Sequence, residues 1–395
     1  MLGSSFSNER SLSMDTAMAP RHESTVSTGV LYIALELSAR EWRLAHTTSL
    51  RAPIRQVVIR AGDRQQLRRA VWRAKAQWGL AADAEVRSCY EAGRDGFWPH
   101  RLLEVDGVEN VVVDSSSIEV NRRARHAKTD RLDARKLVRL LVRWALGERD
   151  VWHQVHVPTP AQEAARQQSR TIAMLTGERT RWRNRIHSAL ATVGVPLRID
   201  AAFPARLAAA QQWDGTAVPL ALQRRVLVAW RLLQQVDTEL RALRRAQHRA
   251  TQGEATVAAR TAHRLTGLRG IGERVAWVLA TELCSRDLRN RRQVGALTGF
   301  TSDHYRSGAL AHDQGISRAG LAPIRSLAVE TAWLWIQWQP QSALTQWFHA
   351  RFAHGGPGGR RRGIVALARR LVIALWRYAR EGTVPAGAVL TARAA

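Results

Sequence analysis

Cysteine is almost absent from this chain of 395 residues. The two that occur, Cys89 and Cys284, lie far apart and have no partners at the spacing of metal ligands. The sequence therefore argues against a disulfide-stapled scaffold and against a zinc site. It fits a reducing compartment, because disulfides persist mainly in oxidising ones.

Long apolar runs are missing as well. A helix needs roughly 20 consecutive apolar residues to cross a bilayer, and Arg369 and Arg370 interrupt the most apolar stretch, residues 363–379. No membrane segment is predicted, and we expect a cytoplasmic, nucleoid-associated bacterial protein. Residues 1–28 lack the basic-then-apolar layout of a signal peptide, so a disordered leader is expected there.

Acidic residues are scarce relative to basic ones. The chain has 60 Lys and Arg against 33 Asp and Glu, which leaves a formal charge of +27. Such a field attracts polyanions, and neutralised phosphates release counterions, so nucleic acid is the predicted partner. Lysine occurs only as Lys75, Lys128 and Lys136, and arginine is the better bidentate phosphate ligand. A GC-rich genome would also explain the arginine excess.

The N-terminal part predicts a sheet with interspersed helices. Apolar alternation favours an antiparallel meander followed by helix, strand, helix and strand, over residues 30–37, 42–47, 56–60, 63–78, 85–90, 97–105 and 108–113. This order is that of the ribonuclease H and RuvC-like nuclease fold. An amphipathic helix with an arginine-rich outer face is predicted over 130–146.

Long polar helices are predicted from Pro158 to about Arg249, with a break at 196–219. A helical hairpin or coiled coil fits this pattern, and an ordinary helical spacer remains an alternative. Part of an apolar seam is supplied by Leu222, Val226, Leu233, Val236, Leu240 and Leu243. From Arg264 to about Arg380 the chain is predicted to be mainly helical, with loops at 301–320 and 355–359.

Two carboxylates open the predicted helix at 130–146. Asp130 and Asp133 are three residues apart and project from one face, as co-ligands of a metal would, although acidic residues also favour a helix's first turn for dipole reasons. Glu36 occupies an apolar position on the first strand, where a buried carboxylate is costly without a cation. Glu91 follows the fourth strand. Converging carboxylates suit phosphodiester chemistry with magnesium or manganese.

These four positions and their neighbours resemble the insertion-sequence one hundred and ten family of transposases. The matching stretches are EAGRDGFW (91–98) and AKTDRLDARKL (127–137). That family joins a RuvC-like domain with a four-carboxylate motif, and its characterised members are recombinases guided by a bridge RNA. The resemblance implies that Mg²⁺ or Mn²⁺ is bound by Glu36, Glu91, Asp130 and Asp133. The family usually has Asp on the first strand, where this chain has Glu36.

A second resemblance lies near the C-terminus. YRSG (305–308) and GISRAG (315–320) are similar to the family's transposase domain, in which the serine before glycine is the nucleophile. By that match Ser307 attacks a DNA phosphodiester and forms a transient covalent link. A hydroxyl needs activation, and the nearby cations and proton acceptors are Arg306, Arg318, His304 and His312. On its own, a Ser-Gly pair is usually a turn. The family's Gly-Asn after the second serine is Gly320-Leu321 here.

Two further segments suggest contacts to nucleic acid. The Gly-Ile-Gly turn within 265–283 is similar to a helix-hairpin-helix, whose backbone N–H groups bind phosphate, and a tight helical turn fits it equally well. The arginines at 360–362 favour a phosphate-binding run or a solvated basic loop. The predicted nucleic-acid contacts are Lys128, Arg131, Gly270, Gly272, Arg306, Arg318, Arg360, Arg361 and Arg362.

Together these observations predict a leader (1–28), a RuvC-like α/β metal-binding domain (29–150), a helical coiled-coil linker (151–260) and a mainly α-helical transposase domain (261–390). The resemblance implies a recombinase of an insertion sequence that acts on DNA, takes a structured non-coding RNA as guide and works as a dimer or tetramer. Two alternatives stay open. One is a RuvC-like endonuclease on branched DNA with Ser307 a bystander, and the other is a catalytically decayed nucleic-acid-binding copy.

Overall fold

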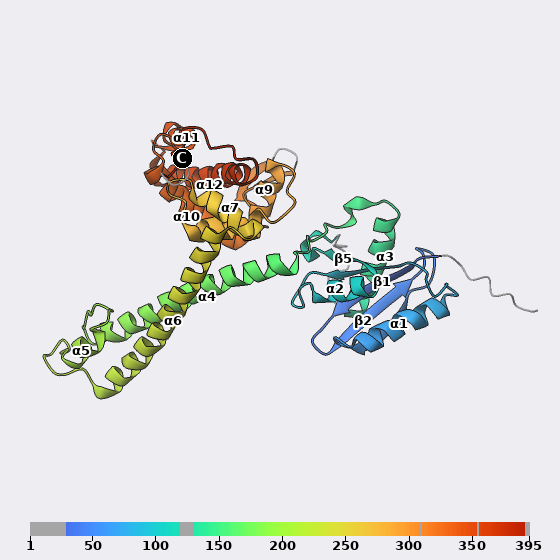
Figure 1. The fold of residues 1–395 in the computed structure, drawn as a ribbon, viewed down its shortest axis with the longest axis horizontal. Helices are drawn as coiled ribbons and strands as arrows, with labels where there is room; N and C mark the ends of the chain where they lie inside the picture. The colour runs from blue at the N-terminus through green and yellow to red at the C-terminus, as the bar shows by residue number, and fades with distance from the viewer. Residues whose placement is uncertain (1–28, 119–129, 308–309, 354, 392–395) are drawn as a thin grey trace, which may run out of the picture. The chain divides into compact units, whose positions relative to one another are not determined.

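The computed structural model describes residues 29–118, 130–307, 310–353 and 355–391, and of 130–133, 303–307 and 310–314 it describes the backbone alone. The chain divides into two compact units, Met1–Val157 and Pro158–Ala395 (Figure 1). Both cysteines are free thiols. Within the described ranges, no helix is long and apolar enough to span a bilayer.

The first unit is built on a five-stranded sheet in the order β3-β2-β1-β4-β5. The strands are β1 (Leu31–Leu37), β2 (Glu41–Thr47), β3 (Arg55–Arg60), β4 (Val86–Glu91) and β5 (Glu109–Val113). The first three pair antiparallel, whereas β4 pairs parallel with both β1 and β5. The order of strands and helices predicted from the sequence is confirmed, including the antiparallel meander.

Helices cover both faces of this sheet. Leu31, Ile33 and Leu35 point to one face, where they pack with α1 (Arg64–Gln77) and α2 (Trp98–Val105). Ala34 and Cys89 point to the other, which is covered by α3 (Asp130–Ala145). Successive strand residues face opposite ways, so both faces of β1 are buried and its residues 31–35 are almost all apolar. The short 3₁₀ turns η1 (Ser115–Ser117) and η3 (Arg149–Val151) flank the connections to α3.

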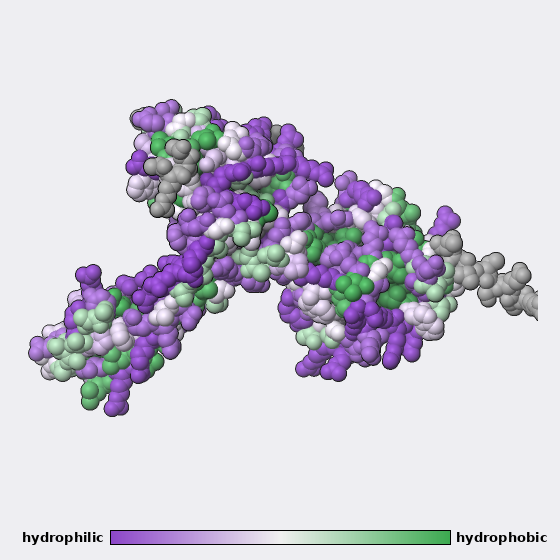
Figure 2. All heavy atoms as spheres, in the orientation of Figure 1, coloured by the Kyte–Doolittle hydropathy of each residue, from purple (hydrophilic) through white to green (hydrophobic). Residues whose placement is uncertain are grey.

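The second unit begins with the helical hairpin that the sequence predicts. Its arms, α4 (Pro160–Ala191) and α6 (Leu220–Gly253), pack along each other, and the short α5 (Phe203–Ala208) lies at the far end (Figure 1). Val226, Leu233 and Leu240 are buried at intervals of seven residues, the spacing of a coiled-coil seam. Hydrophilic side chains cover most of the hairpin surface in view, and apolar ones gather at its tip (Figure 2).

The rest of the second unit is a helical core. Helix α12 (Gly356–Glu381) runs through it and packs against α10 (Ala322–Trp338) and α11 (Ala343–Phe352). The remaining elements are α7 (Val257–Thr266), α8 (Glu273–Val278), the π-helical turn η4 (Leu279–Leu283), α9 (Arg291–Thr298), β6 (Ser302–Ser307) and β7 (Leu310–Ile316).

The two predicted loops of this core are wrong. Most of 301–320 forms the antiparallel pair β6–β7, which the polar sequence of β6 conceals. Residues 356–359 open helix α12, although glycine disfavours helix. Pro357 in the first turn favours a helix start, and a Cβ on Gly356, Gly358 or Gly359 would meet nothing within 4 Å. At Gly363, one turn further along, a Cβ would lie 2.5 Å from the Phe352 ring, so glycine lets α11 approach α12 closely there.

The buried His46 gives the first unit a pH dependence that can be tested. His46 Nδ1 accepts a hydrogen bond from Trp78 Nε1 at 3.0 Å, and Arg55 lies over the Trp78 ring. Burial, and secondarily the charge of Arg55, lowers the pKa of His46 to about 4. In the unfolded chain the pKa is about 6.5, so protons bind the unfolded state preferentially between these values.

We therefore expect stability to be complete near pH 7 and to fall as the pH drops from about 6.5 to 4, by up to about 3 kcal/mol from this group alone. Urea unfolding of the wild type and of His46→Asn, measured across this range, checks the expectation. If both proteins lose the same stability, His46 is not the responsible group.

Candidate active site and nucleic-acid interface

Two of the predicted carboxylates meet at the carboxyl ends of paired parallel strands. Leu35 pairs with Tyr90, so Glu36 near the end of β1 and Glu91 at the end of β4 are one step further along the same register. Strand alternation directs both to the face of Ala34 and Cys89. Burial, and then the charge of Glu91, raises the pKa of the Cys89 thiol well above its usual value.

A small cavity of about 180 Å³ opens beside these carboxylates. The loop after β4 forms one wall, since the Tyr90 hydroxyl donates to the Gly96 carbonyl at 2.9 Å and Ala92 N–H donates to the Val113 carbonyl at 2.8 Å. Its polar lining includes Glu36, Glu91, Arg94, Asp95 and Ser115. The cavity can accept a small cation or a phosphate oxygen.

Asp95 is an acidic residue of this cavity that the sequence analysis did not single out. Its side chain is 19% exposed and pairs with Arg94 at 3.2 Å. The signal available was its place inside the EAGRDGFW stretch, four residues after Glu91. Asp114 follows β5 at the same edge of the sheet, but it is engaged in capping, since it accepts from Ser116 N–H at 2.9 Å.

Asp130 and Asp133 lie in the first turn of α3, as predicted, and their side chains are outside the described residues. The same holds for the side chain of Arg131, and Lys128 lies outside the described residues altogether. Helix α3 packs on β1, β2 and β4, on the face to which Glu36 and Glu91 belong. Among the side chains that the structure describes, no three metal-ligating groups cluster.

Ser307 is the last residue of β6 rather than part of a loop, and it pairs with Leu310. Arg306 pairs with Ala311, and His312 with Tyr305. These positions are described by their backbone alone. At the base of the hairpin, the hydroxyls of Thr301 and Ser317 are 3.0 Å apart.

The segment after the hairpin explains the departure at Gly320-Leu321. A Cβ on Gly320 would lie 2.3 Å from the Leu297 carbonyl oxygen, so only glycine fits. Leu321 is the N-cap residue of α10. Its side chain makes no capping hydrogen bond and packs against the apolar core instead. An asparagine would cap this helix. The departure therefore exchanges a helix cap for apolar packing. The base of the hairpin is still held, because the Leu321 N–H donates to the Leu297 carbonyl at 2.8 Å.

The predicted Gly-Ile-Gly turn joins α7 to α8. Gly270 has a φ of +89°, and a Cβ there would lie 2.8 Å from Trp338 Cβ. Gly272 is the N-cap of α8, and the next residue, Glu273, contacts His248. A carboxylate in this first turn already complements the helix dipole, and its negative charge would repel a phosphate bound there. Internal packing thus accounts for Gly270.

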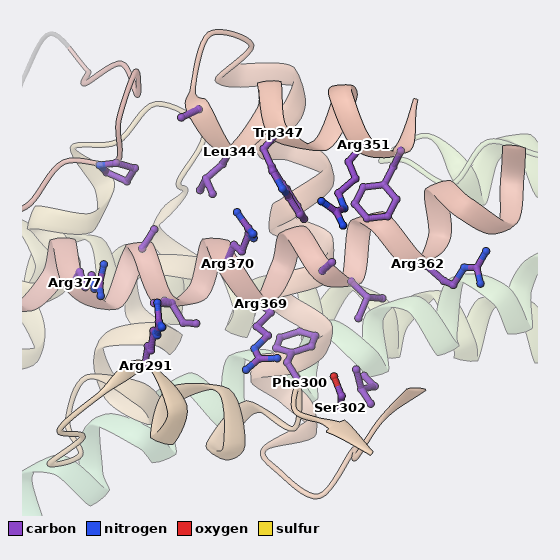
Figure 3. Close-up of a pocket in the computed structure, with 18 of the residues that line it drawn as sticks. Arg291, Phe300, Ser302, Leu344, Trp347, Arg351, Arg362, Arg369, Arg370 and Arg377 are labelled. Carbon is purple, nitrogen blue, oxygen red and sulfur yellow. The ribbon is translucent and has the colours of Figure 1, made fainter. Parts of the chain in front are cut away.

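A large cleft in the second unit is lined by nine arginines and by no acidic residue among those described (Figure 3). Its volume is about 1470 Å³. Helix α12 forms the floor, α11 one side, and α9 with the base of the β6–β7 hairpin the other (Figure 3). The arginines are Arg291, Arg292, Arg318, Arg351, Arg361, Arg362, Arg369, Arg370 and Arg377.

Three of these, Arg318, Arg361 and Arg362, are among the predicted nucleic-acid contacts, whereas Arg360 does not line the cleft. The other six were missed. On α12 the signal was the spacing of Arg362, Arg369 and Arg377, which returns to one helix face every seven or eight residues. In the sequence Arg369 stands out only as an interruption of an apolar run.

Comparison with known proteins assigns the family. Residues 262–346 match the model of the "Transposase IS116/IS110/IS902 family". Over 386 residues the chain is 36% identical to "Putative transposase y4rJ" of Sinorhizobium fredii (strain NBRC 101917 / NGR234). The aligned region covers 92% of this chain and 96% of that protein. The chain belongs to this transposase family.

A more distant relative is the "Transposase for insertion sequence element IS1533" of Leptospira borgpetersenii. It is 26% identical to this transposase over 117 residues, which is 30% of this chain and 32% of the relative. Membership makes the protein a transposase of an insertion-sequence family, which acts on DNA and transfers DNA strands.

The contact between Gly270 and Trp338 yields a stability prediction with an internal control. We expect Gly270→Ala to destabilise the transposase by about 1 to 3 kcal/mol, because Ala is strained at positive φ and its methyl group overlaps Trp338. Gly272 has an ordinary φ of −79° and open space around it, so Gly272→Ala should change stability by less than about 0.5 kcal/mol. Equal effects in thermal unfolding would contradict this account.

Proposed function

We propose that the transposase cuts and rejoins DNA with Ser307 as nucleophile, assisted by a divalent metal held by Glu36, Glu91, Asp130 and Asp133. In this proposal residues 29–150 are a RuvC-like domain and 261–390 the transposase domain. The observation that carries it is the placement of Glu36 and Glu91 side by side at the carboxyl ends of β1 and β4, beside one cavity.

The donor groups fit magnesium or manganese. Two neighbouring carboxylates repel each other when both are ionised, and a divalent cation removes that penalty. All four proposed ligands offer oxygen, the atom these ions prefer. Glu36 reaches one methylene further than the usual Asp, and the cavity beside it has room for this. When bound, the ion would supply charge neutralisation and Lewis acidity toward a phosphate oxygen.

The serine step conserves the phosphodiester. Ser307 Oγ would attack phosphorus and form a phosphoserine ester, while the bond from phosphorus to one sugar oxygen breaks. The serine proton passes to a base, and the leaving oxygen takes up a proton. A hydroxyl of the second strand then attacks the ester, joins the strands and restores the serine. One bond forms for each that breaks, so no external energy source is needed.

The hairpin register identifies the base to test first. Residues two positions apart on a strand belong to the same face, and directly paired residues share a face. Ser307 is therefore grouped with Tyr305 and its partner His312, and Arg306 with His304. His312 is the proposed proton acceptor.

RNA guidance and assembly complete the proposal. The formal charge of +27 is ample for DNA together with a structured RNA guide. The helical hairpin within the proposed linker, 151–260, buries its seven-residue apolar repeat inside itself but exposes Trp213 and Leu220 near its tip, and these two exposed apolar side chains support self-association as a dimer or tetramer.

The test of the nucleophile is a covalent-adduct assay. Purified protein is mixed with magnesium, DNA carrying the element's ends and RNA from its flanking non-coding region. We expect a protein-linked DNA band with the wild type and complete loss of it in Ser307→Ala. His312→Ala should slow adduct formation by about 100-fold or more, whereas His304→Ala should have little effect.

Other outcomes identify the alternatives. Cleavage without an adduct and unaffected by Ser307→Ala would indicate a metal-dependent endonuclease that uses water. Binding without cleavage would indicate a decayed copy.

The metal site is tested by stability rather than by activity. Magnesium at about a hundredfold excess over its Kd should stabilise the folded wild type by about 2.7 kcal/mol. Glu91→Gln and Glu36→Gln should lose most of this gain. Asp83→Asn, which removes an exposed carboxylate of the same unit, should keep it. A magnesium response that survives both glutamate changes would exclude this site.

A further inference from the structure

We infer that the arginine-lined cleft of the second unit binds a single-stranded nucleic acid and stacks a base on Arg370. This inference deepens the proposed function. It rests on that function only in identifying the strand that occupies the cleft during the reaction. The binding itself depends on neither Ser307 nor a metal.

The positive charge of the cleft is uncompensated among the described residues. Nine arginines line the cleft, and none of them has an ion-pair partner among the residues that the structure describes. Elsewhere in the transposase arginines are paired, as in Arg64 and Arg68 with Asp106 or Arg179 with Asp237. Like charges in a shared hollow repel unless a polyanion enters. Guanidinium groups bind phosphate oxygens bidentately, so a phosphate chain is the fitting ligand.

The size of the cleft fits a single strand. From Arg362 to Arg377 the floor formed by α12 extends about 22 Å at 1.5 Å per residue. The volume of about 1470 Å³ exceeds that of a pocket for one drug-sized ligand, about 300 to 1000 Å³. It has room for a few nucleotides of one strand.

An apolar surface lies between the arginines of the cleft. Val365, Ala366, Ile373 and Ala374 line the floor of the cleft, between the arginines of α12. A single strand exposes its base faces to such a surface, whereas a duplex presents phosphates and keeps its bases stacked inside. Sites for single strands combine a positively charged groove with side-chain surfaces on which the bases stack.

Arg370 provides the stacking platform. Its guanidinium lies over the Trp347 ring, 3.9 Å from the ring centroid, and its residue is exposed. In Figure 3 Arg370 and Trp347 project from α12 and α11 into the same space. Because the indole holds the guanidinium on one side, the other side is open to a nucleobase, which stacks on arginine planes as well as on aromatic rings.

The cleft also lies close in sequence to the proposed nucleophile. Ser302 lines it at the start of β6, and the same strand ends at Ser307. Gly315 and Ile316 of β7 line it too. A strand held on α12 would therefore be anchored beside the hairpin that carries the serine.

Binding is tested with the full chain carrying Ser307→Ala, without magnesium, by fluorescence anisotropy over a range of salt. The probes are a thymidine-only DNA strand, a uridine-only RNA strand and a DNA duplex of equal length. The charge-removing variant is Arg369→Gln with Arg377→Gln. Its matched control is Arg224→Gln with Arg225→Gln, two exposed arginines of α6 outside the cleft.

For a single strand, the slope of log affinity against log salt should shrink by about 1.4 in the cleft variant, since each lost phosphate contact contributes about 0.7. The control should keep its slope. Comparing the DNA and RNA strands identifies which of the two the cleft prefers.

Arg370→Lys tests stacking apart from charge. It should weaken single-strand binding by about five- to tenfold, because lysine keeps the charge and loses the planar surface, while the salt slope stays unchanged. Circular dichroism of each variant verifies folding.

Equal losses for duplex and single strand would overturn the inference in favour of a duplex surface. Equal losses of single-strand affinity in the cleft and control variants would show that binding depends on the net charge of the protein and not on the cleft. If the cleft binds a strand normally but the wild-type protein, which keeps Ser307, forms no covalent adduct, only the proposed function is refuted.

Discussion

The parallel pairing of β1 with β4 is the constraint on which the candidate active site depends. Antiparallel strands would bring the start of one beside the end of the other, whereas a parallel pair ends on a single edge. Because Leu35 pairs with Tyr90, Glu36 and Glu91 become neighbours although 55 positions separate them. A register slip of one residue would turn one of them to the opposite face.

A second constraint is the scarcity of acidic residues. Several of them form ion pairs with arginines that connect elements of the fold. Asp106 binds Arg64 and Arg68. Glu282, buried in the π-helical turn, lies 3.0 Å from Arg170 and 3.7 Å from Arg166, and so ties α4 to the helical core. Burial lowers the pKa of Arg166, and the charge of Glu282 opposes that effect.

The arginines of the cleft form a different population. They lie on α9, α11 and α12 and after β7, with no acidic residue among the described lining. Their side of α12 is distinct from its apolar side, which packs the core through residues such as Leu367, Leu371 and Leu375. Charge left uncompensated at a cost to stability is the expected mark of a surface kept for a polyanion.

The sequence by itself determined the elements whose signals are local. Alternation of apolar residues fixed the strands of the first unit, and the seven-residue apolar spacing fixed the hairpin arm α6. The motifs around Glu91 and Asp130 indicated the family that the comparisons then assigned. These features depend on neighbours within one turn or one strand, so the chain displays them directly.

Tertiary structure decided what depends on distant partners. The glycines at 355–359 suggested a loop because glycine disfavours helix, but 356–359 open α12, and further along this helix Gly363 packs closely against Phe352 of α11. Ser307 was predicted within the loop at 301–320, but pairing with a second polar strand made it the end of β6. The cleft was invisible because its arginines come from separate elements, and only folding places them around one hollow.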